Sequence, residues 1–167
     1  RAYIVKDEVA TFDDSQEILK RLLRLIQVTS NPKLIDDSYE QVPGKFIQLE
    51  KLIYEITNRG EKCIVWTSFI DNVEWLAMEF REFGTLKIHG KMSINDRNRS
   101  VRFFKNNDAK KILFATPASA KEGLTLTVAN HVIFYDRGLS LDDYLQAQDR
   151  IHRISQNKTC YVYNIIM

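Results

Sequence analysis

Hydrophobic and polar positions follow two different periods along the chain, and the change of period divides it into two parts. In the first third, apolar residues recur every three or four positions, which is typical of helices that bury one face. This pattern predicts helices over residues 15–28 and 44–58, which end at turn-forming Asn, Pro and Gly residues. Residues 36–43 are expected to form a polar loop. Residues 1–14 lack a clear pattern and are expected to be irregular.

The remainder of the chain alternates short apolar runs with amphipathic stretches. The apolar runs are typical of strands buried on both faces, and they are predicted at 62–67, 85–89, 111–115, 131–135 and 159–166. Helices are predicted between them, at 71–83, at 93–104 and at 140–156. Strands and helices in alternation imply right-handed crossovers. The fold class is therefore α/β, with a mainly parallel sheet and helices on both faces.

Polar residues with useful chemistry follow four of the predicted strands. They are Thr67 and Ser68, the run His89–Gly90–Lys91, Thr116 and Ser119, and the pair Asp136–Arg137. In a parallel sheet the carboxyl ends of the strands share one edge, and ligands gather there. Hydroxyls, a glycine and a lysine at one edge could hold phosphate oxygens. The alternative is that such residues are common in any α/β loop, and only their convergence on one edge favours a site.

The last predicted helix begins at Ser140, a candidate N-cap residue, and continues to Gln156. Within it Gln146, Arg150 and Arg153 are spaced four and three residues apart, so they are expected to share one helical face. Guanidinium groups are always charged and fork onto oxygens, so this face is suited to polyphosphate. A plain solvated helix surface is the alternative explanation of the same spacing.

Composition narrows the class of protein. The chain has 167 residues and a net charge of +2, which suits one globular domain and is too small to indicate a nucleic-acid binder by itself. Cys63 and Cys160 lie in apolar runs and the three His are scattered, so buried thiols are expected and no metal site. Without a membrane-length apolar run or a signal peptide, an intracellular, soluble protein is expected. Since it opens on Arg1, we expect a piece of a longer protein.

Six segments, in chain order, have the character of known motor motifs. They are LLRLIQVTSNPKLI, VPGKFIQLEKLI, KCIVWTSFIDNVEWL, KIHGKMSINDRNRSVRFF, ILFATPASAKEGLTLTVANHVIFYD and QAQDRIHRISQ. On these segments the chain, from Leu22 to Ile166, resembles the second RecA-like lobe of the Swi/Snf-type ATPases, a branch of the superfamily-two helicases. It departs from the family's pattern where Ala120 and Lys121 replace two glycines and where Ser155 replaces another.

The resemblance implies a fold and a domain division. Residues 44–167 would form a RecA-like three-layer sandwich, the C-terminal lobe of a helicase. Residues 1–43 would be an N-terminal helical or linker segment that packs on this lobe.

The resemblance also implies ATP chemistry. ATP with Mg²⁺ would sit between this lobe and an N-terminal RecA-like lobe of the same polypeptide, which would supply the phosphate loop and the Mg²⁺ ligands. Arg150 and Arg153 would be catalytic arginine fingers, and Gln146 and Gly123 would line the nucleotide. No G-x-x-x-x-G-K-[ST] sequence occurs in the chain, so it holds half a site, and we expect the isolated, monomeric fragment to be inactive.

The same resemblance implies a partner, double-stranded DNA, along which the motor would step. The residues expected to grip its phosphates are Thr67, Ser68, Lys91, Arg97, Thr116 and Ser119. Such contacts do not read sequence, which suits a translocase. Two alternatives remain open: a lobe of a strand-separating DNA or RNA helicase, and a non-catalytic nucleic-acid-binding module.

Overall fold

A five-stranded sheet forms the centre of the molecule. The computed structural model describes residues 2–6, 9–13, 15–120, 126–153 and 156–166, and of residues 2–6, 9–13 and 120 it describes the backbone alone. The strands are β3 (Cys63–Trp66), β4 (Thr85–Ile88), β5 (Ile112–Ala115), β6 (His131–Phe134) and β7 (Tyr161–Asn164). All neighbouring strands pair in parallel, in the order β4-β5-β3-β6-β7. The predicted parallel α/β sheet is confirmed.

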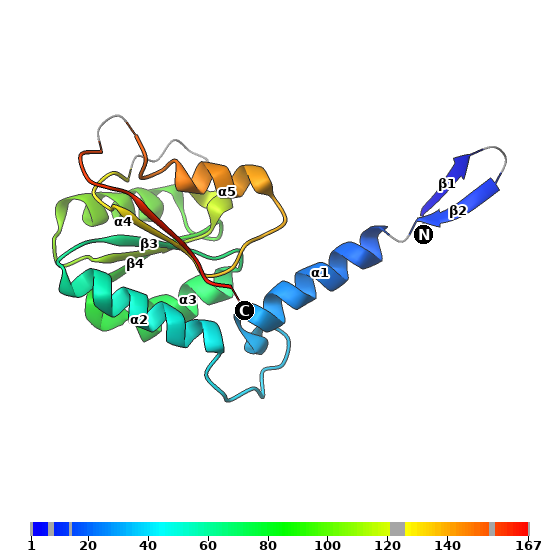
Figure 1. Cartoon of the computed structure of the whole chain (residues 1–167), viewed down its shortest axis with the longest axis horizontal. Helices are drawn as coiled ribbons and strands as arrows, with labels where there is room; N and C mark the ends of the chain where they lie inside the picture. Colours follow the sequence, from blue (N-terminus) through cyan, green and yellow to red (C-terminus); the bar gives the residue numbers. More distant parts are fainter. Residues whose placement is uncertain (1, 7–8, 14, 121–125, 154–155, 167) are drawn as a thin grey trace.

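Two helices cover each face of the sheet (Figure 1). The helices α2 (Gly44–Asn58) and α3 (Ile70–Glu79) pack on one face, and α4 (Ile94–Asn106) and α5 (Leu141–Gln148) pack on the other. The central strands are buried on both sides: Val65 packs toward α2 and α3, whereas Ile64 and Trp66 pack toward α4 and α5. Short 3-10 turns complete the connections, at Pro32–Leu34, Arg81–Phe83 and Pro117–Ala120. These are the three layers expected of the fold.

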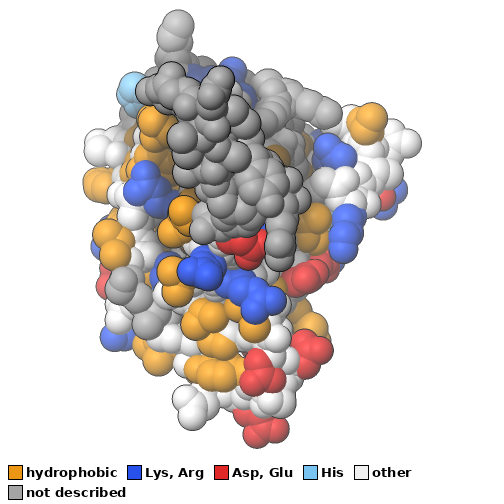
Figure 2. Space-filling view, turned by 90° about the vertical axis from the view of Figure 1, so that its right-hand side faces the viewer, with side chains coloured by type: hydrophobic (Ala, Val, Ile, Leu, Met, Phe, Trp, Pro, Cys, Tyr) orange, Lys and Arg blue, Asp and Glu red, His pale blue; other side chains and the backbone are white. Residues whose placement is uncertain are grey.

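The N-terminal part differs from expectation. Strands β1 (Ala2–Lys6) and β2 (Val9–Asp13) pair as an antiparallel two-stranded sheet, so the expectation of an irregular start is wrong for these residues. The helix α1 (Ser15–Ser30) projects from the sheet with its helices (Figure 1). Several of its apolar side chains, such as Leu22 and Leu25, are exposed. The space-filling view of the side of the molecule from which α1 projects shows hydrophobic side chains next to Lys and Arg (Figure 2).

Two predicted helices are too long: α3 ends at Glu79 rather than at residue 83, and α5 ends at Gln148 rather than at residue 156. The start of α5 is as expected, since the Ser140 hydroxyl accepts a hydrogen bond from a backbone N–H one turn on. At its end, the Arg150 carbonyl accepts from the backbone N–H of Leu126 at 3.1 Å. The side-chain amide of Gln156 donates to the carbonyls of Ala129 and Ile151, at 2.9 and 3.3 Å. Hydrogen bonds to Leu126 and Ala129, together with the local bond to Ile151, thus replace those of a longer helix.

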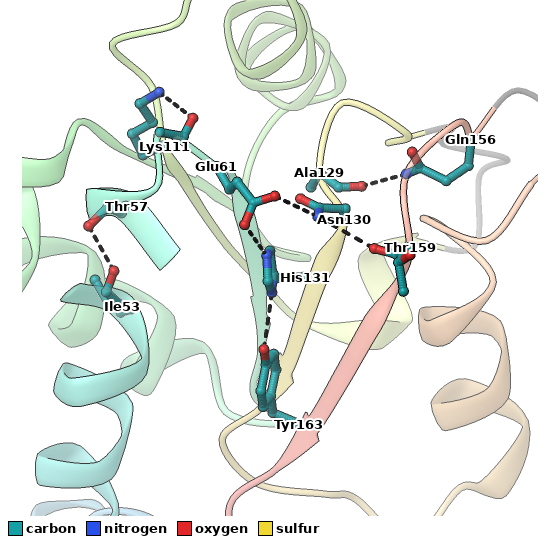
Figure 3. A network of polar contacts seen from close by, with 11 residues as sticks. Ile53, Thr57, Glu61, Lys111, Ala129, Asn130, His131, Gln156, Thr159 and Tyr163 are labelled. Atoms are coloured by element: carbon teal, nitrogen blue, oxygen red, sulfur yellow. Dashed lines mark hydrogen bonds and ion pairs between the residues drawn. The ribbon is translucent and has the colours of Figure 1, made fainter. Parts of the chain in front are cut away.

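A polar network joins β6 and β7 at the amino end of the sheet (Figure 3). The carboxylate of Glu61 lies 2.8 Å from Nε2 of the fully buried His131 and accepts from the Asn130 amide at 3.0 Å. On its other side, Nδ1 of His131 lies 3.3 Å from the hydroxyl of Tyr163 on β7. The ring of Tyr161 stacks on His131, with centroids 5.0 Å apart. This network anchors the exposed edge strand to the buried one beside it.

Candidate functional site

The carboxyl ends of the strands meet in register, as the sequence pattern predicts. Trp66 on β3 pairs with Ala115 on β5 and with Phe134 on β6, so the residues that follow them lie at one edge. A hollow of about 150 Å³ opens there, between this edge and the start of α5. It is lined by Ser68, Thr116, Pro117, Ala118, Phe134, Asp136, Arg137, Gly138, Leu139, Ser140, Asp143 and Tyr144.

A buried carboxylate, Asp136, organises this edge. It is 3% exposed and accepts from the Thr67 hydroxyl at 2.5 Å and from the Ser68 backbone N–H at 2.7 Å. The side-chain amide of Asn72 on α3 also lies within reach of it, at 3.4 Å. A buried carboxylate holds its hydrogen-bond donors in place, because bonds to a charged acceptor are strong and a buried group without a partner would lower the stability of the fold. Sequence reasoning placed Asp136 at the edge but missed its central role. Its only signal was a carboxylate directly after a buried strand.

The network continues to the end of α1. Asn31 donates to the Asn72 side-chain oxygen at 3.1 Å, and the hydroxyl of Tyr135 donates to the Ser30 carbonyl at 2.7 Å. On α2, the ammonium of Lys45 lies 3.3 Å from the Tyr135 carbonyl. Burial lowers the pKa of Lys45, and the nearby charge of Asp136 opposes that shift. Three helices are therefore tied to the same strand end.

Three predicted phosphate contacts have their hydroxyls committed inside the protein. Thr67, Thr116 and Ser119 are each at least 94% buried. The hydroxyl of Thr67 bonds Asp136, and that of Thr116 donates to the Ser119 hydroxyl at 3.1 Å. Ser119 Oγ in turn lies 2.6 Å from the Thr116 carbonyl oxygen. These side chains hold the strand ends together.

The other three predicted contacts lie nearer the surface. Ser68 is half-buried and lines the hollow, where a β-carbon on Gly138 would come within 3.1 Å of its hydroxyl oxygen. Lys91 is exposed after β4. Arg97 is half-buried and donates to the carbonyls of Met92 and Gly90, at 3.1 and 3.3 Å, so it braces the loop that carries Lys91.

The predicted nucleotide contacts do not share one helical face. Gln146 is exposed on α5, whereas Arg150 and Arg153 follow the helix. Arg150 is 7% exposed, and its Nε has no hydrogen-bond partner among the described residues. Burial lowers the pKa of Arg150, the positive charge of Arg153 adds to that shift, and Asp149 opposes it. The structure thus places two arginines close together, one buried and one exposed. Gly123 lies outside the described residues.

The two thiols are buried to different extents. Both cysteines are free, and burial raises the pKa of the fully enclosed Cys63 to about 12. Within the described ranges no group of three His, Cys, Asp or Glu residues could hold a metal ion. No helix in that part of the chain is long and apolar enough to cross a membrane.

Residues 44–155 match a known family, the helicase conserved C-terminal domain. Human lymphoid-specific helicase is 30% identical over 134 residues, which cover 79% of this chain and 16% of that protein. The putative ATP-dependent helicase/translocase YwqA of Bacillus subtilis is 32% identical over 158 residues, which cover 89% and 17%. The chain therefore spans less than a fifth of the length of these relatives.

Solved structures agree on the fold. The Sulfolobus solfataricus SWI2/SNF2 ATPase core in complex with dsDNA is 29% identical with a TM-score of 0.78, over 96% of this chain and 34% of that one. The C-terminal domain of the same ATPase gives a TM-score of 0.71 at 25% identity, over 96% and 66%. This chain belongs to the helicase conserved C-terminal domain family, and its fold is that of the C-terminal RecA-like lobe of the Swi2/Snf2 ATPases.

Proposed function

We propose that this chain is the second motor lobe of a Swi/Snf-type, DNA-dependent ATPase. In this proposal, ATP with Mg²⁺ sits between the lobe and an N-terminal RecA-like lobe of the same polypeptide. The observation that carries the proposal is the buried guanidinium of Arg150, whose Nε has no partner among the described residues and which lies close to Arg153. A buried positive charge is costly, and an anionic ligand such as a triphosphate bound at the exposed Arg153 would stabilise the charge of Arg150.

The two arginines take different parts in this proposal. Arg150 is held by burial, so it would orient the phosphates from a fixed position, whereas exposed Arg153 would reach the γ-phosphate. Bound ATP supplies the phosphoryl group that is transferred to water. Catalysis by this lobe would consist of positioning and of neutralising the developing charge. Gln146 would support the arginines from α5, and Gly123 would line the nucleotide.

The carboxyl edge is the proposed track for duplex DNA. Ser68 and Lys91 offer accessible polar groups there, and half-buried Arg97, which braces the loop that carries Lys91, adds positive charge beside them. Since the hydroxyls of Thr67, Thr116 and Ser119 are bonded within the protein, we propose that these three position the track. The dsDNA complex of the similar Sulfolobus ATPase core supports DNA as the partner.

The test uses the two-lobe protein and measures ATP turnover with and without duplex DNA. Wild type should be stimulated by the duplex. Arg153→Ala should lower kcat by about 10³-fold or more while ATP still binds, because an arginine finger contributes that much. The matched control is Arg81→Ala. Arg81 is exposed and follows α3, on the face of the sheet opposite to α5, so its loss should leave turnover unchanged.

Turnover that ignores DNA, or that survives the loss of Arg153, would contradict the proposal. A forked duplex separated into single strands would instead identify a strand-separating helicase. DNA binding without any turnover by the two-lobe protein would identify a binding module.

A further inference from the structure

The helix α4 has two faces of very different character. It buries Ser100, Val101 and Phe104 against the sheet. The opposite face, at spacings of three and four residues, carries amides and guanidinium groups: Asn95, Asn98, Arg99, Arg102 and Asn106. A shallow surface hollow is lined by the first four of these residues. The outward face of α4 is therefore a row of hydrogen-bond donors.

This face is basic without the usual acidic partners. The helix carries four basic side chains and one acidic one, so its net charge of +3 exceeds the +2 of the whole chain. The single carboxylate, Asp96, lies off this face and accepts from the Ser93 hydroxyl at 2.7 Å. Within the described part of the chain, Arg99 and Arg102 have no ion pair or hydrogen bond. Like charges three residues apart disfavour a helix, so helix stability does not explain this pattern.

The donors match the chemistry of a nucleic-acid backbone. Guanidinium forks and amide N–H groups are typical phosphate contacts, and such contacts carry no sequence information. From Asn95 to Arg102 the helix rises by about 10 Å. One strand of a duplex presents a phosphate about every 3.4 Å along its axis, so about three phosphates would fit this length.

We propose that the outward face of α4 is a second phosphate-binding surface for double-stranded nucleic acid. The helix α4 begins at Ile94, three residues after Lys91, so its first turn lies near the carboxyl end of β4, and α4 covers one face of the sheet (Figure 1). This surface takes the phosphodiester backbone of a duplex in a sequence-independent way. The inference rests on the proposed function only for the choice of duplex DNA as the polyanion.

The experiment measures binding of a fluorescein-labelled 20-bp duplex to residues 1–167 by anisotropy over a series of salt concentrations. Removing two phosphate contacts in Arg99→Gln/Arg102→Gln should make the slope of log K against log salt shallower by about 1.8. It should also weaken low-salt binding by about tenfold or more. Glutamine is a good helix former, so the variant should keep the fold, which circular dichroism checks.

The matched control removes two exposed arginines from the other face of the sheet, in Arg59→Gln/Arg81→Gln. The control should keep the wild-type slope. Equal slopes for all three proteins would overturn the inference. So would a wild-type chain that binds poly-glutamate but no duplex, since the surface would then take an acidic protein. Failure of the proposed function is seen separately, in the Arg153→Ala turnover of the two-lobe protein.

Discussion

At the residue scale, Asp136 is the side chain on which the carboxyl edge depends. Its carboxylate is almost fully buried and accepts from Thr67 and Ser68. In Asp136→Asn, an amide would face these donors and the negative charge beside Lys45 would be lost. We expect the free energy of unfolding to fall by about 3 kcal/mol, because buried donors lose a charged acceptor.

Urea unfolding followed by circular dichroism measures this loss. The control is Asp37→Asn, since that exposed aspartate lies in the loop before α2 and should change stability by less than about 0.5 kcal/mol. A similar midpoint for both variants would mean that the hydrogen bonds at the carboxyl edge contribute little.

At the element scale, the edge strand β7 is held by the network around His131 (Figure 3). Hydrogen bonds from His131 and then Asn130 keep the pKa of Glu61 below its ordinary value of 4.5. A carboxyl whose pKa is lowered on folding stabilises the protein above its unfolded pKa, and this contribution is lost as the pH falls through the folded one. Glu61→Gln should therefore cost about 1–2 kcal/mol at pH 7, and the difference from wild type should shrink below pH 4.5.

Urea unfolding of both proteins, from about pH 3 to about pH 7, provides the measurement, because carboxyl groups lose their charge within this range. Glu79→Gln, an exposed position in the last turn of α3, is the control and should show no such pH dependence. A wild-type advantage that persists unchanged at the acidic end would show that the Glu61 charge is not the cause.

The elements also show what the sequence could predict. The strands and the places of α2 to α4 follow from apolar periodicity, because that signal is local. The predicted helix over 71–83 is too long, since α3 ends at Glu79 and a 3-10 turn follows at Arg81–Phe83. The end of α5 does not follow from this signal, since no Gly or Pro follows Gln148 and the helix stops where Arg150 bonds Leu126. The paired strands at 2–6 and 9–13 have no strong alternation to reveal them.

At the scale of the whole molecule, the sequence predicts that polar residues meet at the carboxyl edge, but it does not predict which hydrogen bonds they form there. Parallel strands place the residues after Trp66, Ala115 and Phe134 together whatever their order in the sheet. Which of those side chains are buried depends on packing among distant segments, such as Asn72 on α3 against Ser30 at the end of α1. Buried hydroxyls and accessible ones look alike in a sequence.

The division of labour between two lobes gives the last prediction: residues 1–167 alone should hydrolyse no ATP, with or without duplex DNA. The chain lacks a phosphate-loop sequence, and the Gly44–Lys45 pair cannot replace one. Lys45 is 8% exposed and lies against the Tyr135 carbonyl, so its ammonium is unavailable to a phosphate. Phosphate release is the measurement, with the two-lobe protein as positive control. Turnover comparable to that control, and lost in Arg153→Ala of the same chain, would contradict the claim that residues 1–167 hold only half of an ATP site. Turnover that survives Arg153→Ala would come from a contaminating ATPase.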